Sequence, residues 1–380
     1  MHGRPRLKPV TLHGSDGQLI LWQRALKRIH IDDSSGSIKA ILQILAIGEY
    51  PVSELGRAMA ERGFAVSAEE IAAVLSALDD LGVLEDADGD DVLDDAARER
   101  HQSNLRFYDL FARLGRTSAS FHQSVARSRV LLLGAGGLGS GILQSLVGLG
   151  VGEVTLVDID IVETKNLARQ FVYGLGAVGR PKVTAARDWA ASYSSGTMVR
   201  PVHQRIADAA AVVTLGAGAD IVVCAIDTPD DIHLIVNEAC FTLGVPFVAG
   251  GLSYSTLSYW SVEPGRTPCR LCLERHRGDE ALTLPPILRQ PPLIEPRPVN
   301  RATGPVVQLI SGLMSMEVTR YLTRADPPVA AAAYQVIELA DRMETSCAPW
   351  QQHPECRLCA AANPPVPARA GSLHSVGAGR

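Results

Sequence analysis

The fold of this 380-residue chain is decided by the stretch Arg129-Val-Leu-Leu-Leu-Gly-Ala-Gly-Gly-Leu-Gly-Ser140. The apolar run 129–133 predicts a buried strand, and 140–149 has the spacing of a helix. Between them, Gly134, Gly136 and Gly139 give the pattern Gly-x-Gly-x-x-Gly. Glycines in such a turn let the backbone approach a phosphate, and the helix N-terminus adds N–H donors and a partial positive charge. The stretch therefore predicts a nucleotide-binding loop.

Strands and helices alternate after this loop. Apolar runs that suit buried strands are followed by stretches with helical spacing, which is the rhythm of a mostly parallel sheet covered by helices on both faces. The expected fold class is therefore α/β, with a Rossmann-like sheet. We expect strands at 153–158, 220–225 and 246–249, helices at 181–191, 229–243 and 305–321, an antiparallel strand at 252–262, and a Pro-rich loop at 283–300.

The first 95 residues have a different pattern, which predicts a separate winged-helix-like domain. Short alternating runs at 11–13, 18–22 and 28–31 predict a small antiparallel sheet. Helical spacing at 37–46, 52–62 and 68–81 predicts three helices, and 83–86 a closing strand or an extended end. We expect an acidic linker at 85–99, a second domain over 96–363, and a disordered polar tail over 364–380.

Composition narrows the possible partners and locations. The net charge is −5, and the helix 68–81, which would face DNA in a winged-helix reader, is acidic. Nucleic-acid binding needs a basic surface, so no nucleic-acid partner is expected. No apolar run is long enough to cross a membrane, and no signal segment opens the chain, so we expect a cytoplasmic protein without a membrane partner.

Polar residues gather after the second predicted strand. Asp158 ends that strand, where its carboxylate can accept hydrogen bonds from a ribose. The loop and Asp158 alone indicate an ordinary NAD or FAD site. The following word, Asp158-Ile-Asp-Ile-Val-Glu-Thr-Lys-Asn-Leu-Ala-Arg-Gln170, adds an arginine and two amides. Hydride transfer does not need them at this point, whereas a triphosphate does.

Two further residues have both a functional and a structural interpretation. Lys182 opens a predicted helix, from which its ammonium could reach a phosphate, although a solvated first-turn lysine has the same position. Asp227 follows the predicted strand 220–225, at the edge of the sheet where ligands bind. Its carboxylate suits Mg²⁺, but Asp227 or Thr228 could instead cap the next helix.

Four cysteines occur in two identical motifs, Cys269-Arg-Leu-Cys272 and Cys356-Arg-Leu-Cys359. Two such pairs can supply four thiolates to one tetrahedral zinc ion, and a shell of four cysteines leaves no open position. We therefore predict a structural zinc site that ties distant segments together. A single redox-active pair is the weaker alternative. Cys224 and Cys240 lie in apolar runs and are expected in the core, and Cys347 has no assigned role.

Taken together, these motifs resemble those of the ThiF/MoeB-type adenylating enzymes, the bacterial relatives of ubiquitin-activating enzymes. The resemblance covers about residues 100–360. It implies ATP- and Mg²⁺-dependent attack of a carboxylate on the α-phosphate, a homodimer and a structural zinc. It also implies roles for single residues: the nucleotide loop contains Gly134, Gly136, Gly137 and Gly139, the ribose is held by Asp158, the phosphates are held by Asn166, Arg169, Gln170 and Lys182, and Mg²⁺ is held by Asp227. Asp160 is expected among the cofactor-binding residues.

Two departures from that family are visible. The family has an Arg-Tyr-x-Arg-like word before this domain, whose second arginine acts in the partner's site; here Ser103 stands at that position, and Arg100 or Arg106 would have to substitute. No cysteine lies in 275–303, which excludes a thioester cysteine of the ubiquitin-activating type there.

The N-terminal part resembles the PqqD-like peptide-binding modules, and its place before an adenylating domain is similar to that in the microcin C adenylating enzymes. This resemblance implies that a peptide adds as a strand beside Arg28–Ile31. The preferred function is adenylation of a carboxyl group on a ribosomally made precursor peptide. The alternatives are activation of a ubiquitin-like sulfur carrier protein, a non-catalytic binding protein, and an NAD oxidoreductase.

Overall fold

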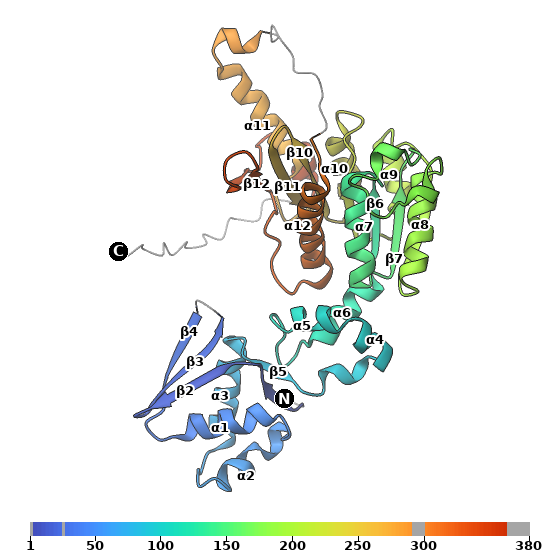
Figure 1. Ribbon diagram of the computed structural model, residues 1–380. Helices are drawn as coiled ribbons and strands as arrows, with labels where there is room; N and C mark the ends of the chain where they lie inside the picture. The colour runs from blue at the N-terminus through green and yellow to red at the C-terminus, as the bar shows by residue number, and fades with distance from the viewer. Residues whose placement is uncertain (1–2, 25–26, 291–300, 363–380) are drawn as a thin grey trace.

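The computed structural model describes residues 3–24, 27–290 and 301–362. A small N-terminal part and a larger part built on an eight-stranded sheet are visible in Figure 1. The expected tail 364–380 and most of the Pro-rich loop 283–300 lie outside the described residues. Within the described ranges, no helix is both long and apolar enough to cross a membrane.

The large sheet is mostly parallel, as predicted. Its strand order is β13-β12-β11-β10-β9-β6-β7-β8, in which the five strands from β10 to β8 run parallel and β11 to β13 continue antiparallel. The strands β12 and β13 were not predicted. The bounds are β6 (Arg129–Leu133), β7 (Glu153–Val157), β8 (Met198–Val202), β9 (Ile221–Cys224), β10 (Phe247–Ser253), β11 (Thr256–Val262), β12 (Ala333–Glu338) and β13 (Glu344–Pro349).

Helices cover both faces of this sheet because its central strands are apolar on both sides. Val130 and Leu132 of β6 contribute to one core with α7, α8 and α12, whereas Leu131 and Leu133 contribute to the other with α9 and α10. The bounds are α6 (Ser118–Arg127), α7 (Gly137–Leu149), α8 (Lys182–Tyr193), α9 (Ala209–Leu215), α10 (Ile232–Leu243), α11 (Arg270–Thr283), α12 (Gly304–Thr323) and α13 (Arg357–Ala362).

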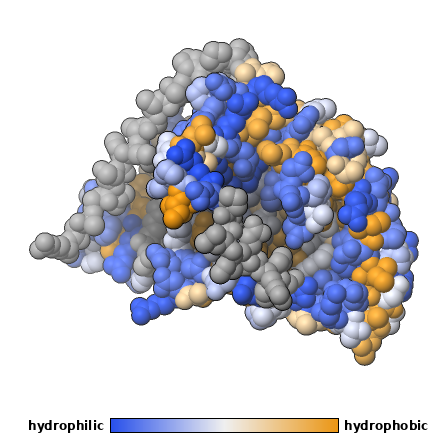
Figure 2. All heavy atoms as spheres, turned by 90° about the horizontal axis from the view of Figure 1, so that it is seen from above, coloured by the Kyte–Doolittle hydropathy of each residue, from blue (hydrophilic) through white to orange (hydrophobic). Residues whose placement is uncertain are grey.

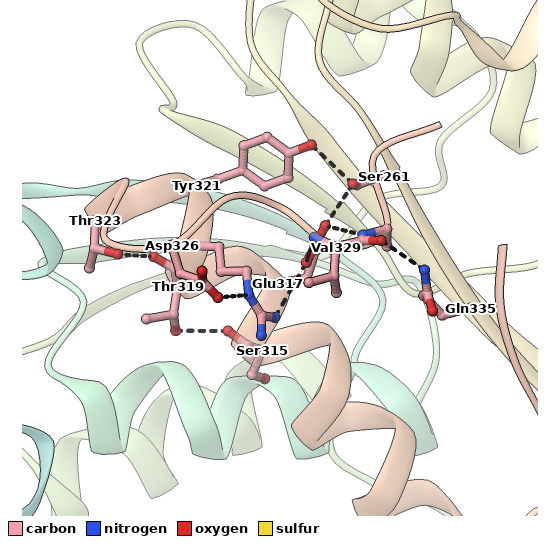
Figure 3. A network of polar contacts seen from close by, with 11 residues as sticks. Ser261, Ser315, Glu317, Thr319, Tyr321, Thr323, Asp326, Val329 and Gln335 are labelled. Carbon is pink, nitrogen blue, oxygen red and sulfur yellow. Dashed lines mark hydrogen bonds and ion pairs between the residues drawn. The ribbon is translucent and has the colours of Figure 1, made fainter. Parts of the chain in front are cut away.

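The long helix α12 is fixed to the sheet by a buried carboxylate. Glu317 has no exposed surface and accepts hydrogen bonds from Ser261 Oγ of β11 at 2.9 Å and from the backbone N–H groups of Val329 and Ala330 at 3.1 and 2.9 Å. Tyr321 Oη lies 3.0 Å from the same serine hydroxyl (Figure 3). These bonds tie the chain that follows α12 to both the helix and the sheet.

The N-terminal part has the predicted winged-helix-like elements. The strands β2 (Thr11–Ser15), β3 (Gln18–Arg24) and β4 (Lys27–Asp32) form an antiparallel sheet, followed by helices α1 (Ser37–Ile47), α2 (Leu55–Ala60) and α3 (Ala68–Asp80). Ser67 and Glu70 form a capping box at the start of α3. The closing strand β5 (Leu84–Asp86) pairs with an unpredicted strand, β1 (Pro5–Leu7).

The expected linker 85–99 is wrong over most of its length. It contains β5, a 3₁₀ turn (Gly89–Val92) and most of helix α4 (Asp95–Arg100), which leads into α5 (Gln102–Tyr108). The junction is also tied by buried contacts. Lys8 Nζ donates to Gly82 O at 3.0 Å and to Ala112 O at 2.7 Å, and Leu114 N donates to Asp79 Oδ1 at 2.9 Å. Burial lowers the pKa of Lys8 to about 8.

Candidate active site

The glycine loop lies at the carboxyl end of β6, at the end of the sheet opposite α5 and α6 (Figure 1). The chain proceeds from β6 to β7 and β8 on one side and returns to β9 on the other, so β6 and β9 flank the point where strand order reverses. Such a point is where open α/β sheets bind ligands. From above, hydrophobic residues form separate groups within a mostly hydrophilic surface (Figure 2).

The glycines of the loop serve different purposes. Gly134 has φ +106°, and a Cβ there would lie 2.6 Å from Ala225 O. A Cβ on Gly139 would lie 1.9 Å from Gly134 O, so this glycine is required by the turn itself. A Cβ on Gly136 would meet open space. Gly136 therefore leaves room for a phosphate group at the N-terminus of α7, which is where a helix favours an anion.

Asp158 is held against the loop. Its Oδ2 accepts from Ala135 N and its Oδ1 from Asp160 N, both at 2.7 Å. These bonds fix the carboxylate at the carboxyl end of β7. Tyr173 completes the arrangement, because its buried hydroxyl donates to Ala135 O at 2.8 Å. Burial raises the pKa of Tyr173, which keeps it a donor. This tyrosine was not identified from the sequence; its position just after the Arg169–Gln170 word was the available signal.

The word 158–170 folds back over the loop. Arg169 lies beside α7, since its Nε is 3.7 Å from where a Cβ of Gly137 would stand. Gln170 is 2% exposed, and its Oε1 has no hydrogen-bond partner among the described residues. Asn166 is also buried, but its Oδ1 accepts from Glu163 N at 2.9 Å. One amide thus shapes the turn, and the other retains a free polar atom.

Lys182 is the first residue of α8 and is buried, which contradicts the interpretation as a solvated first-turn lysine. Its Nζ lies 2.7 Å from Asp160 Oδ2, and its backbone N–H donates to Asp160 O at 2.9 Å. A buried ammonium requires a partner of opposite charge. The structure thus joins two residues that the sequence analysis assigned to separate roles.

Asp227 stands three residues beyond β9, on the other side of the strand reversal from Asp158, and its side chain is exposed. The capping alternative is wrong, because α10 begins at Ile232 and its N-cap is Asp231. Among the residues that the structure describes, the one hydrogen bond to the Asp227 carboxylate is a long one from Thr228 Oγ1, at 3.3 Å. Its carboxylate is therefore available to a cation, and oxygen ligands of this kind suit Mg²⁺.

Arg100 and Arg106 lie far from this loop. Arg100 donates to Tyr193 O at 3.1 Å, and Arg106 pairs with Asp109 at 3.2 Å. Between them, Asn104 donates to Gly148 O, near the C-terminal end of α7, whereas the glycine loop is at its N-terminal end. The helix of 13 residues separates the two ends by about 20 Å. Neither arginine is brought to the loop of its own chain.

The four cysteines form one buried cluster, as predicted. Their sulfur atoms are separated by 3.7 Å (Cys269–Cys272), 3.4 Å (Cys269–Cys356) and 3.5 Å (Cys272–Cys359). Four thiolates about 2.3 Å from a tetrahedral zinc lie about 3.8 Å apart, so the spacing fits the ion. The thiol contact between Cys269 and Cys272 lowers the pKa of Cys272 and raises the pKa of Cys269, so one sulfur of the pair is the proton donor and the other the acceptor. A bound metal requires both as thiolates.

The remaining cysteines also follow the sequence analysis. Cys224 and Cys240 are fully buried. Cys347 is exposed on β13, where Gln335 Nε2 donates to its sulfur at 3.3 Å, and it lies outside the metal cluster.

Comparisons with known proteins agree with this geometry. The ThiF family model matches residues 108–358. The molybdopterin-synthase adenylyltransferase of Salmonella typhimurium is 30% identical over 246 residues, which are 62% of this chain and 89% of that protein. The Sulfur carrier protein ThiS adenylyltransferase of Bacillus subtilis is 35% identical over 167 residues, 43% of this chain and 48% of that protein.

Solved structures extend the likeness to the N-terminal part. The crystal structure of E. coli MccB with ATP has a TM-score of 0.71 at 17% identity and covers 94% of this chain and 100% of that one. MccB is described as a microcin C7 biosynthetic enzyme. At this identity the likeness concerns the fold. The family match, in contrast, disfavours the two other expectations, an NAD oxidoreductase and a non-catalytic binding protein. The chain belongs to the ThiF family of ATP-dependent adenylating enzymes.

Proposed function

We propose that this chain uses ATP to adenylate a carboxyl group of a ribosomally made precursor peptide, with the leader segment held by residues 1–95 and the chemistry performed by residues 96–363. The observation that carries the proposal is the extent of the two kinds of match. The MccB fold covers 94% of this chain, whereas the molybdopterin-synthase adenylyltransferase covers 62%. MccB has been solved with MccA and with N-formylated MccA.

The edge of the N-terminal sheet provides a place for the leader. The strand β4 pairs only with β3 in the described sheet, so its other side is free to pair with an added strand. Arg28 and His30 are exposed on it, and the Arg28 guanidinium lies 4.9 Å from the ring centre of Trp22. An extended peptide would gain backbone hydrogen bonds here and contacts with this exposed pair.

The chemical problem is that a carboxylate is a poor electrophile. In the proposed reaction, one carboxylate oxygen forms a bond to the α-phosphorus of ATP, the bond from that phosphorus to the bridging oxygen breaks, and pyrophosphate leaves with the electron pair. The product is an acyl-AMP. The task of the enzyme is positioning and neutralisation of phosphate charge.

Each candidate residue then has a defined task. Asp158 holds the ribose, and the open space at Gly136 admits phosphate. Arg169, Gln170 and Lys182 contact phosphate oxygens, while Asp160 and Asn166 keep this segment in place. Mg²⁺ would be held by Asp227 and phosphate oxygens, where it neutralises charge. The four cysteines hold a structural zinc that ties α11 to the last described turn of the chain.

We further propose that the active form is a homodimer in the cytoplasm. A cavity of 420 Å³ lies between α5, α7 and α12, and Phe107, Leu110 and Met316 on these elements or beside them are 39%, 47% and 43% exposed. A second copy would cover these apolar side chains. It would also explain why Arg100 and Arg106 lie at the end of α7 away from their own glycine loop.

A second candidate function is activation of a ubiquitin-like sulfur carrier protein. It is favoured by the sequence relatives. The match to the molybdopterin-synthase adenylyltransferase of Salmonella typhimurium spans 89% of that protein, and the relative in Bacillus subtilis is an adenylyltransferase of the sulfur carrier protein ThiS. That function does not require a peptide module in front of the catalytic domain.

ATP–pyrophosphate exchange distinguishes the two. The full chain would be assayed with peptides encoded beside its gene, with the same peptides lacking their leaders, and with a ubiquitin-like carrier protein. Exchange driven by the intact peptide, with a higher KM for the shortened one, is expected. Exchange driven by the carrier alone would favour the second function.

Two variants locate the leader site. Trp22→Ala and Arg28→Glu should raise the KM for the intact peptide and leave that for the leaderless peptide unchanged. Lys39→Glu on α1, in the same module, is the matched control. Equal effects on both peptides would remove the support for β4 as the docking edge.

A further inference from the structure

A second group of metal-ligating side chains lies outside the cysteine cluster. His276 and Asp279 on α11 and His353 in the loop before α13 each offer a ligand atom, and these three atoms all lie within 4.8 Å of one another. His353 Nε2 is 2.9 Å from Asp279 Oδ2, and the rings of His276 and His353 are 4.9 Å apart. None of the three has a task in adenylation.

The cysteine cluster explains why these residues meet. His276 follows Cys272 by one helical turn on α11, and Asp279 follows His276 by three residues, so both project from one side of the helix. On the other segment, Cys356 N donates to His353 O at 3.0 Å. The four cysteines therefore fix both backbones, and the histidines and the aspartate are brought together with little further loss of chain entropy.

We propose that His276, Asp279 and His353 bind a second transition-metal ion, with Zn²⁺ as the natural test ion. Two imidazoles and one carboxylate are a common zinc ligand set, and water would complete the tetrahedron. The site differs from the cysteine cluster, where four thiolates leave no open position. It would join α11 to the loop before α13 at a second point.

The hydrogen bonds of the three residues set the affinity of this site. His353 Nδ1 accepts from Glu355 N at 3.1 Å, so its proton is on Nε2 and points to Asp279. A metal at Nε2 displaces that proton to Nδ1, with no net release, and the bond from Glu355 N–H is lost. Asp279 is also 68% exposed. The second ion is therefore held less tightly than the first and is removed by a chelator that leaves the cysteine-bound ion in place.

The test is metal titration of the full chain, without a histidine tag, after treatment with a mild chelator. Elemental analysis should then find one zinc per chain, and added Zn²⁺ should be bound to a second equivalent. With Co²⁺ in place of Zn²⁺, the second equivalent should add visible absorption without the thiolate charge-transfer band of the first.

Variants assign the site. Asp279→Asn keeps a hydrogen-bond acceptor for His353 and should weaken the second equivalent at least about tenfold, while the first remains. Glu280→Gln, at the next residue on α11, which is also exposed, is the control and should titrate like the wild type. A wild-type chain that takes up no second equivalent, or an Asp279→Asn chain that titrates like the control, would overturn the proposal.

Discussion

Lys182 and Asp160 form an ion pair with 2.7 Å between Nζ and Oδ2, and the lysine side chain is 7% exposed while the aspartate side chain is 62% exposed. The acid is thus the part of the pair that faces solvent, beside the segment that carries Asp158. An incoming phosphate could share the ammonium only at this exposed side. The pair therefore holds the ammonium beside the segment that carries Asp158, where the proposed nucleotide site lies.

The first prediction concerns this lysine. Lys182→Met should lower ATP–pyrophosphate exchange about 100-fold or more, because a positioned donor to developing charge is typically worth that much. Asp160→Asn should have a smaller effect, since the ammonium remains but is less well aimed. Lys165→Met, which removes an exposed lysine of the same segment, is the control. Equal activity of Lys182→Met and the control would contradict the assignment.

The second prediction concerns the carboxylate beyond β9. Asp227→Ala should abolish ATP–pyrophosphate exchange while the melting temperature stays near that of the wild type, because the side chain is exposed. Asp227→Asn should retain weak exchange at raised Mg²⁺ concentration. Asp230→Ala, an exposed neighbour, is the matched control. Normal exchange by Asp227→Ala would reject the magnesium role.

The sequence was sufficient where chemistry and local pattern coincide. The glycine loop follows a strand and opens a helix as predicted, and the two cysteine words meet although 87 residues separate Cys269 from Cys356. Both predictions succeeded because glycines and cysteines at these spacings are rarely needed for packing alone. A glycine whose Cβ would lie 1.9 Å from a carbonyl, as at Gly139, admits no other residue.

The sequence was insufficient where long-range contacts decide. The unpredicted strand β1 has three residues and pairs with β5 across the whole N-terminal part, so it shows no period of its own. The segment 85–99 looked like a linker because it is acidic, yet Asp94 caps α4 through a bond to Ala97 N at 2.7 Å. The pairing of Lys182 with Asp160 could not be foreseen either, because it depends on how α8 begins beside the end of β7.

The third prediction tests the cysteine cluster. Cys272→Ser should lose the tightly held zinc and lower the melting temperature, because a hydroxyl is a poor zinc ligand and metal binding contributes to folding. Cys347→Ser, on the exposed strand β13, is the control and should keep its zinc. The zinc content is measured after mild chelation, so that only the tight ion is counted. Unchanged zinc in Cys272→Ser would exclude the four-cysteine site.

The fourth prediction is a pH dependence of stability. His101 and His122 are buried with ring centres 4.2 Å apart, and burial lowers the pKa of His101 to about 4, with a further contribution from His122. The unfolded chain binds a proton at His101 below about pH 6.5 and the folded chain does not. Stability is therefore complete above pH 6.5 and falls between pH 6.5 and 4, by about 3 kcal/mol at most from this group.

The measurement compares wild type with His101→Gln. Between pH 6.5 and 4, the free energy of unfolding of the variant should fall less steeply with falling pH than that of the wild type. The difference in slope should correspond to the uptake of up to one proton, although the variant is less stable at neutral pH. Above pH 7 the two slopes should coincide, which serves as an internal control. Identical slopes in the acid range would show that His101 is not held neutral by the fold.

The last prediction concerns Glu317 and the network in Figure 3. Glu317→Ala removes the acceptor of the N–H groups of Val329 and Ala330, and it leaves the N–H of fully buried Ala330 without a partner, whereas Val329 is 44% exposed. An unpaired buried donor costs about 1–3 kcal/mol, so the variant should lose at least that much stability and melt several degrees lower. Glu317→Gln keeps one acceptor oxygen, so its melting temperature should lie between those of the wild type and Glu317→Ala. Glu344→Ala on β13 replaces an exposed glutamate and should change the melting temperature little.

Because Glu317 lies on the same helix whose first turn contacts the glycine loop through Val307, the ATP affinity of Glu317→Gln separates two possibilities. A weakened affinity would mean that the network also positions the loop, whereas an unchanged affinity with lowered stability would confine its role to the fold.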